Sequence, residues 1–196
     1  MNSIKWLFLQ NKIMADWLRL LSKCLVLLAC LFIISMQPAF AGIKDDRYDG
    51  NIFVVYAGNG SLVPPRETLA QALKEHKPTI LVFYVDDSSD CKEYAIVVSR
   101  VQEFYGRAAE ILAINVDTIP SKKTYEPTEP GYYYSGGVPQ VVVFNQSGEV
   151  VLNEKGLVPY EHIDDQFRKI FNLLPRTETA ELKRRAFNEF SSELSK

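Results

Sequence analysis

An unbroken apolar run at residues 79–85 limits the fold of this chain more than any other feature. A strand with water on one face alternates apolar and polar residues, whereas a continuous run is typical of a central strand buried on both faces. Apolar residues at helical spacing follow from Asp90 to about Phe104, and Asp90 with Glu93 fits a capping box. A buried strand that leads through a polar turn into a helix indicates an α/β domain.

The rest of the chain supplies further elements for such a domain. A β-branched and aromatic run at 52–56 predicts another strand, and Gln146-Ser147-Gly148 predicts the turn of a hairpin. The complete prediction has strands at 52–56, 79–85, 111–116, 140–144 and 149–152, and helices at 66–75, 90–104, 159–174 and 177–194. This order of elements predicts an α/β fold in which helices flank the sheet.

The N-terminus has the pattern of a targeting segment. Four basic residues accompany a 12-residue apolar run at 25–36, and Ala39-Phe40-Ala41 supplies a small-x-small cleavage motif. Because a membrane span needs about 20 apolar residues, we favour a cleaved signal peptide at 1–41 over an uncleaved anchor. Export would place the domain in a periplasm or a comparable lumen. The other predicted boundaries are a charged, loose linker at 42–50, a domain at 51–175 and a C-terminal amphipathic helix at 176–196.

Charge and cysteine content argue against several classes of function. Residues 42–196 carry a net charge of −5 and no long basic run, which is a poor match for nucleic-acid binding. His76 and His162 are distant in sequence and lack a cysteine or acidic cluster, so we expect no metal site and no cofactor. Removal of the signal peptide would leave Cys91 as the one cysteine, which rules out an internal disulfide.

Two motifs in the chain resemble the two halves of a thioredoxin active site. The first is the strand at 81–85 with the turn Asp87-Ser88-Ser89-Asp90-Cys91-Lys92, which aligns without a gap with the family's Trp-Cys-Gly-Pro-Cys-Lys turn. The second is Gly137-Val138-Pro139-Gln140, which together with the hairpin matches the family's cis-proline segment. The resemblance covers roughly residues 52–174. It implies a thioredoxin-like fold with a central mixed sheet flanked by helices.

The first motif departs from the family in ways that bear on chemistry. Ser88 stands where the family has its attacking cysteine, and Cys91 stands where it has the resolving cysteine. A serine hydroxyl cannot form a mixed disulfide, so dithiol exchange is not expected. Asp87 and Asp90 replace a tryptophan and a proline and disfavour a thiolate at Cys91. We interpret Cys91 as a small apolar core residue, and the alternative is a reactive thiol.

The second motif keeps the cis-proline element with which the family binds extended peptide chains. The resemblance implies a cis bond before Pro139, where an extended peptide can pair with the preceding backbone. Tyrosines just before this turn are suited to interfaces. The predicted partner-binding surface consists of Asp87, Ser88, Val138, Pro139, Tyr132, Tyr133 and Tyr134. In the alternative interpretation, Pro139 serves the fold alone and the tyrosines cover the domain's own core.

These features also resemble a cyanobacterial group of thioredoxin-like thylakoid proteins, the photosystem I accumulation factors. The resemblance implies a membrane-associated assembly role on the lumenal side, with extended segments of client proteins such as photosystem I subunits or assembly factors as partners. We therefore predict a non-catalytic binding module. The alternatives are a monothiol oxidoreductase that uses Cys91 and a scaffold that binds a partner through its C-terminal helix.

Overall fold

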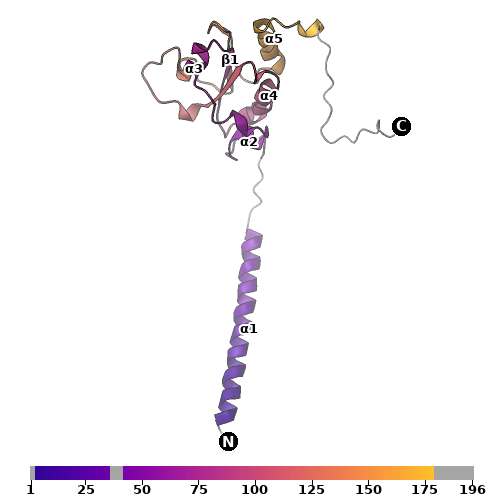
Figure 1. The fold of residues 1–196 in the computed structure, drawn as a ribbon. Helices are drawn as coiled ribbons and strands as arrows, with labels where there is room; N and C mark the ends of the chain where they lie inside the picture. The colour runs from indigo at the N-terminus through magenta and orange to yellow at the C-terminus, as the bar shows by residue number, and fades with distance from the viewer. Residues whose placement is uncertain (1–2, 36–41, 179–196) are drawn as a thin grey trace, which may run out of the picture. The chain divides into compact units, whose positions relative to one another are not determined.

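The computed structural model describes residues 3–35 and 42–178, and the chain divides into two units at Ala41. The first unit contains a single described element, the helix α1 (Ser3–Ser35) (Figure 1). Among the described residues, no helix combines the length and the apolar character needed to cross a membrane. The predicted cleavage motif at 39–41 lies outside the described residues, so the prediction of a signal peptide stands as made.

The second unit is built on a four-stranded mixed sheet. Its strands are β1 (Thr79–Tyr84), β2 (Glu110–Asn115), β3 (Gln140–Phe144) and β4 (Val150–Lys155). They lie in the order β2-β1-β3-β4, in which only β1 and β2 run parallel. The predicted thioredoxin-like class and the β3–β4 hairpin are therefore confirmed.

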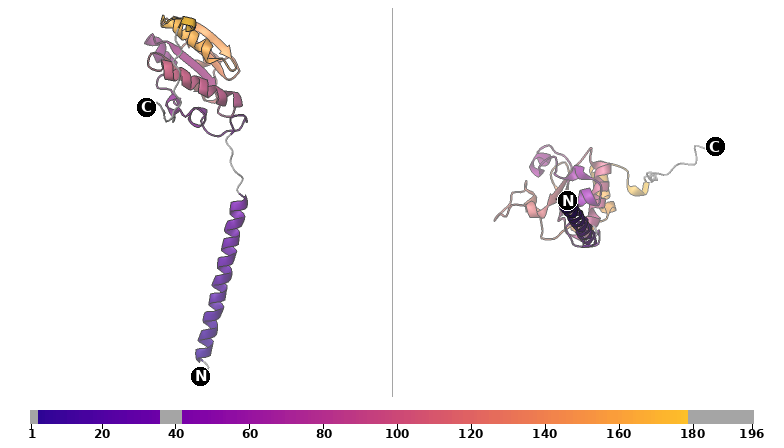
Figure 2. Two further views of the ribbon diagram at one scale, coloured as in Figure 1. Left: turned by 90° about the vertical axis from the view of Figure 1, so that its right-hand side faces the viewer. Right: turned by 90° about the horizontal axis from the view of Figure 1, so that it is seen from below.

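Helices cover both faces of this sheet, which explains the unbroken apolar run in β1. The helices of the domain are α2 (Ile52–Val55), α3 (Leu69–Lys74), α4 (Ser89–Tyr105) and α5 (Tyr160–Ile170). Figure 1 shows α3 on one side of β1 and α4 and α5 on the other, and Figure 2 gives two further views. Alternate residues of β1 divide accordingly: Ile80 and Val82 join the core beneath α4 and α5, whereas Leu81 and Phe83 join the core beside α3.

The strand predicted at 52–56 is wrong, because these residues form the short helix α2. Asn51 caps this helix by accepting a hydrogen bond from the Phe53 N–H. The neighbouring residues Ile52 and Phe53 are both fully buried, whereas a strand at a sheet edge would bury alternate residues. Long-range contacts thus override the strand propensity of the β-branched run.

Several predicted helix ends also differ from the structure. The capping box of Asp90 with Glu93 is wrong, because α4 begins at Ser89 and Ser88 is its N-cap. The helix predicted from 66 begins instead at Leu69, where Thr68 and Gln71 form a capping box. The closing helix ends at Ile170 rather than 174. Residues 176–178 form a 3-10 turn, and the rest of the predicted C-terminal helix lies outside the described residues.

Candidate functional site

Ser88 is positioned at the junction of β1 and α4 as the cap of the helix. Its backbone is extended, with φ −97° and ψ 125°, and its Oγ accepts a hydrogen bond from the Cys91 N–H at 3.3 Å. A hydroxyl at this position satisfies one of the free N–H groups at a helix start. The residue aligned with the family's attacking cysteine therefore serves a structural purpose in this chain.

Cys91 lies inside the core beneath α4. Only 1% of its surface is exposed, and it packs in the same cluster as Tyr84 and Ala95. Burial raises the pKa of the Cys91 thiol, and the charges of Asp90 and Asp87 raise it further. These effects outweigh the opposing hydrogen bonds with Val85 and Ser88. The interpretation of Cys91 as a core residue is confirmed, and its low reactivity is a prediction.

A strap formed by residues 42–49 packs against the start of α4. The Lys92 side chain is fully buried, and its Nζ lies 2.8 Å from Asp49 Oδ2 and 3.1 Å from Asp45 Oδ1. The same ammonium group donates to the carbonyl oxygens of Asp45 and Gly42. Burial lowers the pKa of Lys92, but the hydrogen bonds that its ammonium group donates to the two carboxylates outweigh burial and raise this pKa. The sequence predicts a loose linker at these residues. In the structure they are held by hydrogen bonds to Lys92, which lies over forty residues away in the sequence.

The strap also occupies the N-terminal end of α4. The Ser89 N–H donates to Asp46 Oδ1 at 2.8 Å, and this hydrogen bond lowers the pKa of the Asp46 carboxyl. A carboxylate at a helix N-terminus is favoured by the helix dipole. With Ser88 and Asp46 both in place, the chain's own side chains accept from the first turn of α4.

Asp86, the first residue after the apolar strand, connects the motif to its surroundings, a role that the sequence did not indicate. Its carboxylate accepts hydrogen bonds from the Ile52 N–H at 3.0 Å, from Asn51 Nδ2 at 3.2 Å and from Asn115 Nδ2 at 3.0 Å. Burial raises the pKa of this carboxyl. Burial likewise raises the pKa of Tyr84, which accepts from Asn51, to about 12. Asp86 thereby ties α2 to the ends of β1 and β2.

The second motif keeps the backbone form that the resemblance implies. The Val138–Pro139 peptide bond is cis, Pro139 is buried, and Val138 packs against both core clusters. The fully buried Gln140 side chain supports the segment before it, because it accepts from the Ser135 N–H and donates to the Tyr133 carbonyl oxygen. No sequence motif marked Gln140 for this role, since its partners lie in an irregular segment.

The three tyrosines divide into two inward-packing rings and one exposed ring. Tyr133 stands edge-on to Phe144 at a centroid distance of 4.9 Å, and its hydroxyl donates to the Pro127 carbonyl oxygen. Tyr134 packs 5.3 Å from Phe83. Tyr132 is 55% exposed. Two of the three rings thus cover the core beside α3, as the alternative interpretation expects, and Tyr132 offers a ring to solvent.

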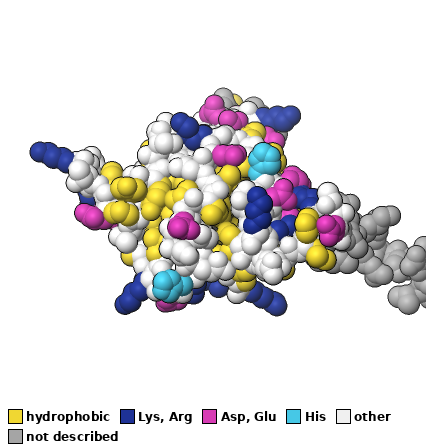
Figure 3. Space-filling view, turned by 90° about the horizontal axis from the view of Figure 1, so that it is seen from above, with side chains coloured by type: hydrophobic (Ala, Val, Ile, Leu, Met, Phe, Trp, Pro, Cys, Tyr) yellow, Lys and Arg dark blue, Asp and Glu magenta, His cyan; other side chains and the backbone are white. Residues whose placement is uncertain are grey.

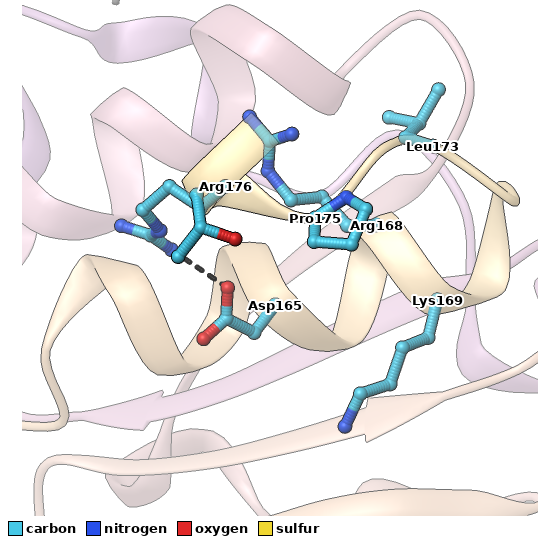
Figure 4. Close-up of a pocket in the computed structure, with 7 residues that line it drawn as sticks. Asp165, Arg168, Lys169, Leu173, Pro175 and Arg176 are labelled. Atoms are coloured by element: carbon cyan, nitrogen blue, oxygen red, sulfur yellow. Dashed lines mark hydrogen bonds and ion pairs between the residues drawn. The ribbon is translucent and has the colours of Figure 1, made fainter. Parts of the chain in front are cut away.

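A pocket of about 460 Å³ beside α5 is lined in part by charged side chains, several of which take part in ion pairs (Figure 4). Arg176 donates to Asp165 at 3.1 Å and to Asp164 at 3.0 Å, and Arg168 donates to Asp164 at 2.7 Å. Asp164 is buried and also accepts from the hydroxyls of Tyr105 and Tyr160. These pairs fasten the end of the described chain to α5, so the arrangement is explained by packing. Within residues 3–35 and 42–178, no group of acidic, histidine or cysteine side chains could hold a metal ion.

Comparison with known proteins shows which sequences and structures this chain is similar to. A family model described as a thioredoxin-like domain matches residues 65–171. A thylakoid membrane protein of Synechocystis sp. (strain ATCC 27184 / PCC 6803 / Kazusa) is 58% identical over 156 residues, which are 80% of this chain and 78% of the relative.

Solved thioredoxins give more distant matches. A point mutant of thioredoxin from Halobacterium salinarum NRC-1 is 23% identical and has a TM-score of 0.40. The match covers 53% of this chain and 83% of the thioredoxin chain. The germline-specific thioredoxin Deadhead of Drosophila melanogaster is 24% identical and has a TM-score of 0.39. The match covers 51% of this chain and 86% of the Deadhead chain.

Proposed function

Because this chain belongs to the family of thioredoxin-like domains, we propose that it uses the family's fold to bind proteins rather than to exchange disulfides. The observation that carries this proposal is the position of Ser88. Its hydroxyl caps α4 where a thiolate would be needed, and the remaining thiol of Cys91 is buried with a raised pKa. Neither group is suited to attack a disulfide.

The setting of this function follows from the relative in Synechocystis. That protein is a thylakoid membrane protein, which supports the same membrane for this chain at 58% identity. We extend this to an assembly or accumulation factor that acts on the lumenal side, with extended segments of photosystem I subunits or of their assembly factors as clients. The likeness of the two motifs to photosystem I accumulation factors supports this finer proposal.

The surface proposed for clients is the rim formed by Asp87, Ser88, Val138, Pro139 and the tyrosines 132–134. Asp87 is exposed, Ser88 and Val138 are half-exposed, and Tyr132 presents its ring to solvent. Tyr133 and Tyr134 support the rim from within, so Tyr132 is the ring that a client would contact. An extended client would pair with the backbone at Val138 and lie across this ring.

A pull-down of the full chain from its own thylakoid membranes tests the binding role. The comparison is between wild type, Tyr132→Ala and Phe104→Ala, where Phe104 is an equally exposed ring on α4. Since a ring at a binding hot spot contributes about 2 kcal/mol, Tyr132→Ala should reduce recovery of photosystem I subunits at least tenfold. Phe104→Ala should retain them. Equal recovery with both variants would remove the rim from the proposal.

A reductase assay tests the absence of catalysis. The purified chain with dithiothreitol should reduce insulin no faster than dithiothreitol alone, because Ser88 cannot form the mixed disulfide. The variant Cys91→Ser should give the same rate. Turnover well above background that is lost in Cys91→Ser would instead establish the monothiol oxidoreductase.

A further inference from the structure

An apolar groove lies between α3 and the segment that joins β2 to β3. Its volume is about 530 Å³, within the range of roughly 300–1,000 Å³ typical of ligand sites. Hydrophobic side chains gather around a hollow at the left of Figure 3, the side on which this joining segment projects in Figure 1. The apolar part of the groove is formed by Pro65, Leu69, Ile114, Ile119, Tyr125 and Pro130.

The outer wall of the groove is held in shape by its own hydrogen bonds. The Tyr125 hydroxyl donates to the Pro120 carbonyl oxygen at 2.8 Å, and the Glu126 N–H donates to Glu129 Oε2 at 3.0 Å. The Tyr125 ring also packs closely on Gly131, where an added Cβ would clash with the ring. A wall that is already ordered loses little conformational entropy when it binds a partner.

The charged side chains that line the groove are both acidic, Glu67 and Glu129. Glu129 is paired with Lys122, and Glu67 Oε1 is paired with Lys77 at 2.7 Å. The second oxygen of Glu67 is buried and has no hydrogen-bond partner among the described residues. A buried carboxylate oxygen without a donor is costly, so a donor brought by a ligand would be favoured at this point.

We propose that this groove, which places apolar walls beside the unpartnered Oε2 of Glu67, binds an extended segment of a partner protein that carries an apolar side chain next to a lysine or arginine. The apolar side chain lies between Ile114, Ile119 and Tyr125, which line the groove and are partly exposed. The cation donates to Glu67, after a small shift that opens the buried oxygen. Because Glu129 and the Oε1 of Glu67 are already paired with lysines, the preference for a basic segment over an acidic one rests on the Oε2 of Glu67. This site is separate from the rim and does not depend on it.

Three blocked hexapeptides with a fluorescent label serve as probes for the full chain in mild detergent. The first has the sequence Gly-Ile-Leu-Lys-Ser-Gly, the second has glutamate in place of lysine, and the third has alanine in place of isoleucine and leucine. Fluorescence anisotropy should show binding of the first peptide and binding at least roughly fivefold weaker for each of the other two, because each lacks one of the two contacts. Equal binding of the lysine and glutamate peptides would overturn the proposal.

Variants of the chain then locate the bound peptide. Glu67→Gln should weaken binding of the lysine peptide roughly fivefold. Glu75→Gln should leave this binding unchanged, because Glu75 also pairs with Lys77 but does not line the groove. Ala70→Arg at an exposed position of the groove should abolish binding, and Tyr132→Ala should not affect it. Melting curves show that each variant is folded. If binding survives Ala70→Arg, or is lost in Tyr132→Ala, the peptide binds elsewhere and the proposed binding in the groove is overturned.

Discussion

The N-terminal end of α4 and the groove beside α3 differ in how the chain treats their polar groups. At the start of α4, Ser88 and Asp46 accept the N–H groups of the first turn, and the strap lies over the helix end. In the groove, Glu67 Oε2 is buried and has no hydrogen-bond partner among the described residues. The polar groups at the position where the family carries out chemistry are thus satisfied within the chain, whereas the groove keeps one carboxylate oxygen without a partner among the described residues.

Loss of the contacts between the strap and Lys92 tests the first half of this comparison, and we expect it to have the largest effect on stability. Lys92→Met keeps most of the buried alkyl stem but removes the ammonium group that Asp45 and Asp49 share. Breaking a buried ion pair is strongly destabilising, so the melting temperature should fall on the order of 10 °C. Circular dichroism would measure this fall. Lys155→Met, at an exposed position on β4, is the control and should leave the melting temperature unchanged.

Alanine variants of Tyr133 and Tyr132 compare a ring that packs in the core with a ring that is exposed for contact with a partner. Tyr133→Ala removes a ring that packs on Phe144, so the free energy of unfolding should fall by about 2 kcal/mol. Tyr132→Ala removes an exposed ring and should change it by less than about 0.5 kcal/mol. Urea unfolding distinguishes the two. A larger loss in Tyr132→Ala would mean that the exposed ring supports the fold.

The capping role of Ser88 should appear as a smaller loss of stability. Ser88→Ala removes the acceptor for the Cys91 N–H, which typically costs about 1 kcal/mol at an N-cap. Ser88→Asn keeps a capping oxygen and should stay close to wild type. Urea unfolding of both variants measures the effect. If Ser88→Ala were as stable as wild type, the cap would not be the reason for serine at this position.

The sheet and the chemical character of the motif could be predicted because their signals are local. The unbroken run in β1 and the turn at 146–148 identify a central strand and a hairpin from spacing alone. The burial of Cys91 follows from its place in the motif. In contrast, α2 has a strand-like sequence, and its helix depends on a hydrogen bond from the Ile52 N–H to Asp86, 34 residues away.

The strap and the groove show a second limit of sequence-based inference. Asp45 and Asp49 meet Lys92 across 47 and 43 residues, and the sequence between them does not mark the pairing. The groove lies between α3 and the segment from β2 to β3, which has four prolines and no regular strand or α-helix, so no periodic pattern predicts the shape of the groove. Ion pairs and pockets between distant segments depend on the assembled fold, which single-sequence patterns do not encode.

Acid should open the strap at the start of α4, and this is the smallest effect that we expect. Hydrogen bonds lower the pKa of Asp46 through Ser89, and of Asp49 through Lys92 and Tyr56, below the ordinary value of 3.8. A carboxyl with a lowered pKa contributes stability that is fully present above 3.8 and is lost as the pH falls through the lowered value. Hydrogen exchange of the Ser89 amide, corrected for the intrinsic rate, should therefore be constant from neutral pH to about pH 5 and rise below about pH 4. Asp46→Asn keeps an acceptor without a titrating charge and should flatten this rise at Ser89. Loss of protection between pH 7 and pH 5 would show that a group other than these carboxyls holds the strap.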